Sequence, residues 1–154
     1  MSPVDLPSLL QTICTEFGDV GHDVAYAGPQ RLAWVCRPNA LARAVTNIVD
    51  NAVQHGSAVR VGLRAGGGGL AEIEVADDGP GIPAPLREKV FDPFFKGDDT
   101  RSAASGRGFG LGLSIARDVV RGHGGGIELR DRLPRGLVVR MSLPRNPSGL
   151  RPAI

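Results

Sequence analysis

The hydrophobic positions near the start of the chain follow first a helical and then a strand period. Within VDLPSLLQTICTEF, apolar residues recur at three- and four-residue spacing, as expected for an amphipathic helix: Leu6, Leu9, Leu10, Ile13 and Phe17. The segments HDVAYAG and RLAWVC then have the composition of two short strands, joined at GPQ. The sequence therefore predicts a helix followed by a β-hairpin.

A second amphipathic helix is predicted from Asn39 to about His55. Its apolar stripe recurs at helical spacing and consists of Leu41, Val45, Ile48 and Ala52. The stripe beside it is polar and consists of Asn47, Asn51 and His55. This helix is expected to pack on a core while presenting two carboxamides along one edge.

The second half of the chain predicts two hairpins separated by a long loop and a helix. AVRVGLRA and LAEIEVAD flank GGGG, and GIELRD and GLVVRMSL flank LPRG. Residues 79–109 lack a sustained period and should be mostly loop, with one helix around PLREKVF; a loop of that length is usually functional. GLGLSIARDVVRGHGG should form a helix entered and stopped by glycine, and residues 145–154 a frayed tail.

Composition narrows the class of protein. With 154 residues, of which 42% are hydrophobic, residues 1–154 should form a single domain with one core. A net charge of +2 and the absence of basic runs interleaved with aromatics argue against nucleic acid as a partner. No apolar run reaches the roughly 18 residues that span a bilayer. Cys14 and Cys36 lack metal-site spacing, which favours buried thiols in a reducing compartment.

The stretch VADDGPGIP places two carboxylates and two glycines after a predicted strand. One of Asp77 and Asp78 is a candidate acceptor for an exocyclic amine such as that of adenine, while Gly79 and Gly81 allow a flat ring to approach the backbone. A solvated acidic turn is the plain alternative. GPGIPA also satisfies the dinucleotide-binding pattern G-x-G-x-x-A, but prolines stand where a helix should start and no second parallel half follows.

The stretch GRGFGLGLSIAR alternates glycines into the first turn of a predicted helix. Free amides at a helix start bind anions, and Gly106, Gly108, Gly110 and Gly112 would let phosphate oxygens reach them. It is not a Walker loop, because G-x-x-x-x-G-K-[ST] is absent from the chain. A glycine hinge without a ligand is the alternative.

The intervening segment FDPFFKGDDTRSAAS combines aromatic anchors with basic residues. Phe91, Phe94 and Phe95 are candidates for fixing the loop to the core. The basic side chains, which either reach phosphates or are simply solvated, are Lys96, Arg101 and Arg107.

The asparagine pair in TNIVDNAVQHG is interpreted together with these other motifs. Asn47 and Asn51 lie four residues apart and so point the same way, and carboxamide oxygens suit Mg²⁺ shared with substrate phosphates. Alone, such a pair would be assigned to packing or capping. With an adenine-type turn and a phosphate-type helix start in the same chain, metal and nucleotide binding is favoured.

In this order, TNIVDNAVQHG, VADDGPGIP, FDPFFKG and GRGFGLGLSIA resemble the N, G1, F and G2 boxes of the ATP-binding catalytic domain of sensor histidine kinases. That domain belongs to the GHKL superfamily, with gyrase, Hsp90 and MutL-type ATPases. The boxes cover residues 41–116, and VVRGHGGGIEL extends the likeness to about residue 143. The resemblance implies an α/β fold: a two-layer sandwich of a mixed, mostly antiparallel sheet with helices on one face and a mobile ATP lid.

The resemblance also assigns roles by position. Asn51 would bind Mg²⁺ with Asn47 as its neighbour, both being catalytic positions, and Asp77 would accept the adenine amine. His55 would touch the nucleotide, and the base would be lined by Gly79, Gly81 and Ile82. The phosphates would meet Gly108, Phe109, Gly110, Leu111, Gly112 and Leu113. Gln54 departs from the Lys or Arg common in the family, a lost contact that Lys96, Arg101 or Arg107 would replace.

Asn47 helps to choose between chemistries. The superfamily's ATPases carry a glutamate four residues before the Mg²⁺ asparagine, where it activates water. A carboxamide cannot take a proton, so Asn47 favours phosphoryl transfer over hydrolysis.

The family's phosphoacceptor is a histidine in an H-E-x-x-x-P-type motif on a separate dimerisation domain. None of His22, His55 and His123 has that context. The resemblance therefore implies a cytoplasmic domain of a longer, membrane-anchored sensor kinase, with ATP and Mg²⁺ as ligands. Its partners would be the parent's dimerisation domain and a response regulator, without membrane contact of its own. An anti-sigma-type serine kinase, disfavoured by Asn47, and a non-catalytic nucleotide sensor remain alternatives.

Overall fold

The structure, a computed structural model, describes residues 1–92 and 110–145. Its helices are α1 (Leu6–Asp19), α2 (Pro38–His55) and α4 (Gly110–Gly122). Its strands are β1 (Ser2–Asp5), β2 (Asp23–Ala27), β3 (Ala33–Cys36), β4 (Ala58–Gly66), β5 (Leu70–Asp77), β6 (Gly126–Asp131) and β7 (Leu137–Pro144). Short 3-10 turns, η1, η2 and η3, occupy Gly67–Gly69, Ala84–Leu86 and Lys89–Phe91.

A five-stranded mixed sheet in the order β2-β4-β5-β7-β6 forms one layer of the molecule. Only β2 and β4 run parallel; the three other pairs are antiparallel. Along β5, Asp77 stands opposite Val59 of β4 and Leu137 of β7. The last residue of β5 therefore lies between two neighbouring strands, at one end of the sheet.

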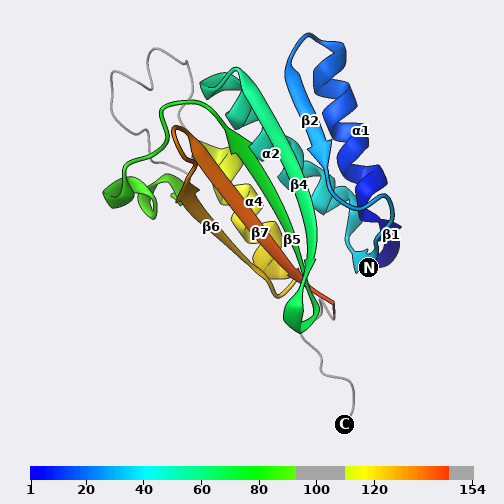
Figure 1. The fold of residues 1–154 in the computed structure, drawn as a ribbon. Coiled ribbons are helices and arrows are strands. Elements are labelled where there is room, and N and C mark those ends of the chain that lie inside the picture. Colours follow the sequence, from blue (N-terminus) through cyan, green and yellow to red (C-terminus); the bar gives the residue numbers. More distant parts are fainter. Residues whose placement is uncertain (93–109, 146–154) are drawn as a thin grey trace.

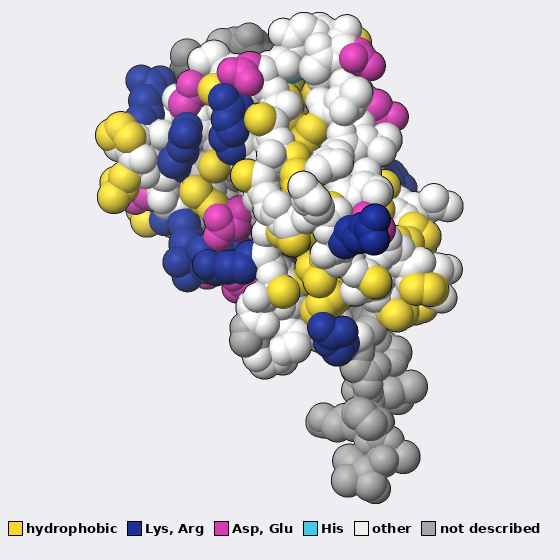
Figure 2. Space-filling model, turned by 45° about the vertical axis from the view of Figure 1, so that its right-hand side comes forward, with side chains coloured by type: hydrophobic (Ala, Val, Ile, Leu, Met, Phe, Trp, Pro, Cys, Tyr) yellow, Lys and Arg dark blue, Asp and Glu magenta, His cyan; other side chains and the backbone are white. Residues whose placement is uncertain are grey.

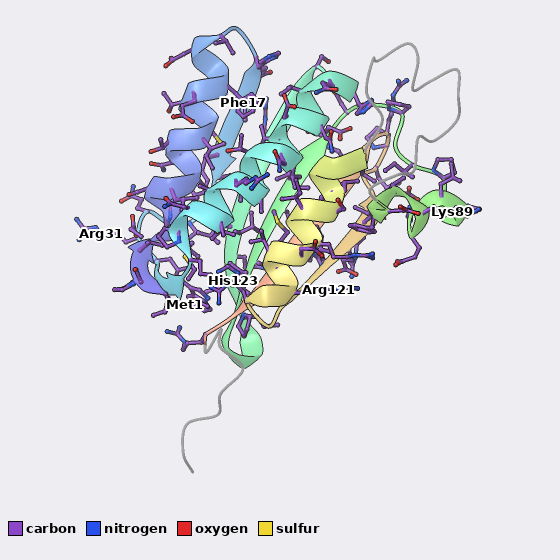
Figure 3. The ribbon with its side chains drawn as sticks, turned by 180° about the vertical axis from the view of Figure 1, so that it is seen from behind. Met1, Phe17, Arg31, Lys89, Arg121 and His123 are labelled. Carbon is purple, nitrogen blue, oxygen red and sulfur yellow. The ribbon has the colours of Figure 1, made fainter. Side chains whose placement is uncertain are left out.

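The helices form the second layer, on a single face of the sheet (Figure 1). Viewed from behind, α1, α2 and α4 lie in front of the strands (Figure 3). The alternate residues of β5 that face them are buried, as are the apolar stripe residues of α2: Leu41, Val45, Ile48 and Ala52. The predicted two-layer α/β sandwich is confirmed; its lid, residues 93–109, lies outside the described residues.

The opposite face of the sheet is open and carries paired charges. Arg64 pairs with Glu72 across β4 and β5, and Arg140 of β7 pairs with both Glu74 and Glu128. Figure 2 shows basic and acidic side chains lying side by side on the surface. No helix among residues 1–92 and 110–145 is long and apolar enough to cross a membrane.

The prediction of a hairpin from HDVAYAG and RLAWVC is wrong. Both segments are strands, but β2 pairs with β4 and β3 pairs with β1. Asp5 fixes the second pairing, because its Oδ1 accepts a hydrogen bond from the Leu32 amide at 2.9 Å and its Oδ2 one from the Ser8 hydroxyl. β1, which contains Pro3 and has little apolar alternation, was not predicted.

Three smaller expectations can also be compared with the structure. The single helix expected at PLREKVF is instead the pair of 3-10 turns η2 and η3. Of residues 145–154, which were expected to fray, Arg145 is held by its amide, which donates to the Gly69 carbonyl at 2.7 Å, while residues 146–154 lie outside the described residues. Cys14 and Cys36 are buried free thiols, as expected, and burial raises the pKa of both.

Candidate nucleotide-binding site

Asp77 ends β5 as the last member of a buried alternating series. Ala71, Ile73 and Val75 precede it on the helix-covered side of the strand, and its side chain is only 5% exposed. Its Oδ1 accepts a hydrogen bond from the Gly79 amide at 2.8 Å. Burial raises the pKa of this carboxyl, although the Gly79 hydrogen bond opposes the shift.

The Asp78 carboxylate, in contrast, is bound to the backbone before β4. Its Oδ1 accepts hydrogen bonds from the Ser57 and Ala58 amides at 2.6 and 3.1 Å, and its Oδ2 accepts one from the Ser57 hydroxyl at 3.0 Å. The Ala58 and Ser57 donors lower the pKa of this carboxyl to about 2. Asp78 thus fixes the start of β4, and Asp77 is the aspartate of the pair left to face the helices.

Asn51 lies on α2 beside the apolar stripe, as predicted. Its Nδ2 is buried and has no hydrogen-bond partner among the described residues. One turn further, Gln54 donates to Asp50 Oδ2 at 3.0 Å, while Gln54 Oε1 is also buried and unpartnered in the described part of the chain. Orphaned buried amide groups are costly, so their presence on this edge of α2 points to a polar ligand.

The start of α4 packs directly against this edge of α2. A Cβ on Gly112 would lie 3.2 Å from Asn51 Nδ2 and 3.7 Å from Asn47 Cβ, so a larger residue would crowd both asparagines. The helix begins at Gly110, and Leu111 follows in its first turn. The N-terminal turn of α4, where free amides are found, therefore adjoins the asparagine pair.

A small pocket lies where α2, α4, β5 and β7 meet. It brings together Asn51, Asp77 and Leu113, which come from three separate sequence motifs. The complete lining is Ile48, Asn51, Ala52, Val75, Asp77, Leu113, Leu137 and Val139. The cavity measures about 10 Å³, which is room for one water-sized molecule, and the Asp77 carboxylate that lines it is placed to accept a hydrogen bond from a ligand.

The turn after Asp77 frames this pocket without lining it. A Cβ on Gly79 would lie 2.2 Å from the His55 carbonyl oxygen, so only glycine fits between the turn and the end of α2. Gly81 has a φ of +77°, a conformation that favours glycine. Ile82 is buried in the main core.

Several predicted contacts lie outside the described residues: Lys96, Arg101, Arg107, Gly108 and Phe109, together with the expected anchors Phe94 and Phe95. The third expected anchor, Phe91, is buried as predicted, and the guanidinium of Arg117 on α4 lies 4.3 Å from the centre of its ring. The start of the F box is thereby fixed to the helix that carries Gly112.

Asn51 could supply one oxygen ligand to a cation such as Mg²⁺. Rotation of the Asn51 carboxamide would turn its oxygen to the orphaned position. The described residues contain no group of three or more His, Cys, Asp or Glu side chains able to hold a metal. A cation here would therefore depend mainly on phosphate oxygens and water, as protein-bound Mg²⁺ commonly does.

Comparison with known proteins settles the family. The family model described as "Histidine kinase-, DNA gyrase B-, and HSP90-like ATPase" matches residues 36–147, which include all four sequence boxes. This chain belongs to that family.

Individual proteins similar to this chain agree with this assignment. The chain is 38% identical over 142 residues to sensor histidine kinase GtrS of Pseudomonas aeruginosa, covering 92% of this chain and 28% of GtrS. It is 30% identical to the solved mycobacterial sensor histidine kinase MprB, with a TM-score of 0.77 and coverage of 95% and 98%. Full-length ShkA in complex with AMPPNP has a TM-score of 0.76 at 25% identity, covering 95% of this chain and 31% of ShkA. The chain spans about a quarter of the length of the curated relatives.

The sequence patterns do not predict every residue of this candidate site. Leu137 and Val139 line the pocket from β7, and Arg135 donates from Nε to the Gly79 carbonyl at 3.1 Å. The alternation in GLVVRMSL marks Leu137 and Val139 as buried, but it does not say which strand or helix they face. Arg135 had no signal, because its partner is 56 residues away in the sequence.

Proposed function

We propose that this domain binds Mg²⁺-ATP and transfers the γ-phosphoryl group to a histidine on a separate dimerisation domain of the same sensor kinase. The phosphoryl group would then pass to a response regulator. The observation that carries this proposal is the shared pocket of Asp77, Asn51 and Leu113, in a chain of the histidine kinase-like ATPase family.

The base side of the proposed site depends on Asp77. Its buried carboxylate has one oxygen engaged by Gly79 and is the charged acceptor of the pocket. Adenine offers an exocyclic amine to such an acceptor, whereas guanine presents a carbonyl oxygen that the carboxylate would repel. The apolar lining supplies the surface against which the ring is buried.

The phosphate side would be formed by α2 and α4. Bound Mg²⁺ bridges phosphate oxygens and offsets their charge, with Asn51 as its protein ligand. The first turn of α4, Gly110 to Leu113, would present amides to the phosphates. We place the remaining phosphate contacts on Lys96, Arg101, Arg107, Gly108 and Phe109, with His55 against the nucleotide.

Asn47 supports transfer rather than hydrolysis. It lies one turn before Asn51 and close to Gly112, and its carboxamide cannot take a proton from water. The relatives GtrS and MprB are named sensor histidine kinases, and ShkA was solved with AMPPNP, an ATP analogue. The carboxamide at position 47 and the similarity to these kinases together favour a kinase domain that positions ATP.

We further propose that residues 1–154 are one catalytic domain of a longer sensor kinase. Supporting this, the chain spans 28% of GtrS and 23% of CpxA of Escherichia coli. The parent would be anchored in the inner membrane, with this domain on the cytoplasmic side.

Replacing Asp77 with Asn tests the base contact. Titration calorimetry with Mg²⁺-ADP should show heat for the wild type and none for Asp77→Asn, because a carboxamide is a weaker acceptor for the amine. The fold should survive, since Asn still accepts the Gly79 hydrogen bond. Because burial raises the pKa of Asp77, its ionised form costs stability at neutral pH, and the variant should unfold at or above the wild-type temperature.

The metal contact is tested in the same titration. Asn51→Ala should bind Mg²⁺-ADP about as weakly as the wild type does with EDTA present. Unchanged ADP affinity in Asp77→Asn, or a full Mg²⁺ effect in Asn51→Ala, would contradict the assignment of these side chains.

A further inference from the structure

The turn between β6 and β7, residues 132–136, packs backbone against backbone on the turn that follows Asp77. Gly136 has a φ of +123°, and a Cβ there would lie 1.9 Å from the Asp77 carbonyl oxygen. In return, a Cβ on Gly81 would lie 3.1 Å from the Gly136 carbonyl oxygen. The hairpin turn is closed by the Arg132 amide, which donates to the same Gly136 oxygen at 3.0 Å. The two turns therefore form one rigid contact.

Arg135 completes this contact with a side chain. Its Nε donates to the Gly79 carbonyl at 3.1 Å, while the Gly79 amide donates to Asp77 Oδ1 at 2.8 Å. Both hydrogen-bonding groups of Gly79 are thereby engaged, and the His55 carbonyl excludes a side chain from its third side. Arg135 therefore holds the Gly79 carbonyl, and Asp77 holds the Gly79 amide.

We infer that Arg135 is a positioning residue for recognition of the base. The Gly79 carbonyl and the Gly79 amide belong to different peptide planes that meet at the Gly79 Cα, so Arg135 holds one plane while Asp77 Oδ1 holds the other. Without the Arg135 hydrogen bond, Gly79 gains freedom about its own φ and ψ, and the amide that orients the Asp77 carboxylate is held less firmly. The effect on the ligand passes through Gly79 and Asp77. This inference rests on the proposed adenine contact of Asp77 and deepens it, because it names a residue that makes the contact selective.

A second effect of the same guanidinium must be separated from positioning. A cation near the site also attracts nucleotide phosphates, whatever their base. Positioning predicts a loss that depends on the group at position 6 of the purine. Simple attraction predicts an equal loss for all nucleoside diphosphates, and a loss that shrinks as salt is added.

The test compares ADP with IDP, whose base carries a carbonyl where adenine has its amine. Affinities of wild type, Arg135→Ala and Arg135→Lys are measured by displacement of a fluorescent ATP analogue in the presence of Mg²⁺. The control is Arg132→Ala, which removes a basic side chain from the same turn but leaves the backbone hydrogen bond from residue 132 intact. Thermal unfolding without nucleotide is recorded for each protein.

Arg135→Ala should bind ADP about fivefold to tenfold more weakly, a change of about 1–1.4 kcal/mol, and IDP nearly as the wild type does. Arg135→Lys should recover part of the preference, since an ammonium can donate to the Gly79 carbonyl, and Arg132→Ala should match the wild type. The unfolding temperature of Arg135→Ala should stay close to that of the wild type.

Equal weakening of ADP and IDP, or unchanged binding of both, would overturn the inference while leaving the ATP site in place. A wild-type protein that binds neither nucleotide would refute the proposed function itself, and this inference with it.

Discussion

At the scale of single residues, two adjacent aspartates at the end of β5 occupy opposite surroundings. Asp77 is buried and its pKa is raised, whereas Asp78 accepts three hydrogen bonds and its pKa falls to about 2. The first arrangement favours a ligand that donates a hydrogen bond, and the second stabilises the loop that leads into β4. We therefore assign Asp77 to the proposed site and Asp78 to the stability of the fold.

Asp78 should give the protein a pH-dependent stability. Its pKa is lowered in the folded state from 3.8 to about 2, so its contribution is complete above pH 4 and is lost as the pH falls toward 2. We expect the free energy of unfolding of Asp78→Asn, measured in urea, to lie below that of the wild type at pH 6. The two values should converge as the pH approaches 2.

Asp19 supplies the matched control, because it is an exposed aspartate at the end of α1. Asp19→Asn should follow the wild type across the same pH range. A constant gap between Asp78→Asn and the wild type would show that the Asp78 hydrogen bonds act independently of its charge.

Part of the site was readable from single residues. The residues alone left Asp77 and Asp78 as equal candidates, and the family resemblance chose Asp77; in the structure the buried series of Ala71, Ile73 and Val75 extends to Asp77. The orphaned Asn51 amide and the Gly79 contact with Arg135 depend on segments distant in the sequence. No local pattern encodes such contacts, so only the structure reveals them.

At the scale of elements, α2 and α4 carry the helical side of the proposed site and contact each other near both ends. At the site, Gly112 packs against Asn47 and Asn51. At the far end His123, 1% exposed, lies beyond α4, near the start of α2 (Figure 3). Its Nε2 accepts a hydrogen bond from the Arg37 amide at 2.9 Å, and its Nδ1 lies 2.8 Å from the Val119 carbonyl oxygen.

Replacing His123 with Ala should destabilise the fold by about 2–4 kcal/mol, because it opens a cavity at a buried side chain and leaves the Arg37 amide without its partner. Urea unfolding measures this loss. His22→Ala is the control: His22 is exposed, and its removal should change stability by less than about 0.5 kcal/mol. A loss for His123→Ala as small as that of the control would show that the two helices do not depend on this bridge.

The periodic elements were predictable, but the partners of the short strands were not. The long stripes of α1, α2 and α4 and the two glycine-turn hairpins agree with the structure. The prediction of a β2–β3 hairpin is wrong because an alternating pattern identifies a strand but not the strand with which it pairs. In the structure β3 pairs with β1. A hydrogen bond between Asp5 and Leu32, which are 27 residues apart, fixes that pairing. A single contact of this kind produces no periodic pattern in the sequence.

At the scale of the whole molecule, the two faces of the sheet do different work. The helices cover one face and build the pocket at its end, while cross-strand ion pairs occupy the other. Such exposed ion pairs add little stability to the fold. The proposed nucleotide site lies on the helix-covered side, where β5, α2 and α4 meet.

The histidines of the chain are poorly placed to accept a phosphoryl group themselves. His123 is buried with both ring nitrogens engaged, and His22 lies exposed in the turn between α1 and β2. His55, at the end of α2, belongs to the proposed nucleotide site. None of the three has the H-E-x-x-x-P-type context, so the proposed reaction takes its acceptor from another domain.

Phosphoryl transfer to that acceptor is the most direct test of the central claim. This chain is mixed with the histidine-bearing helical domain of its parent kinase, γ-labelled ATP and Mg²⁺, and the labelled protein is then exposed to acid and to alkali. We predict label on the helical domain that is lost in acid and kept in alkali, and that is absent with Asp77→Asn. Acid-stable label, or no transfer by a domain that binds Mg²⁺-ATP, would contradict the account.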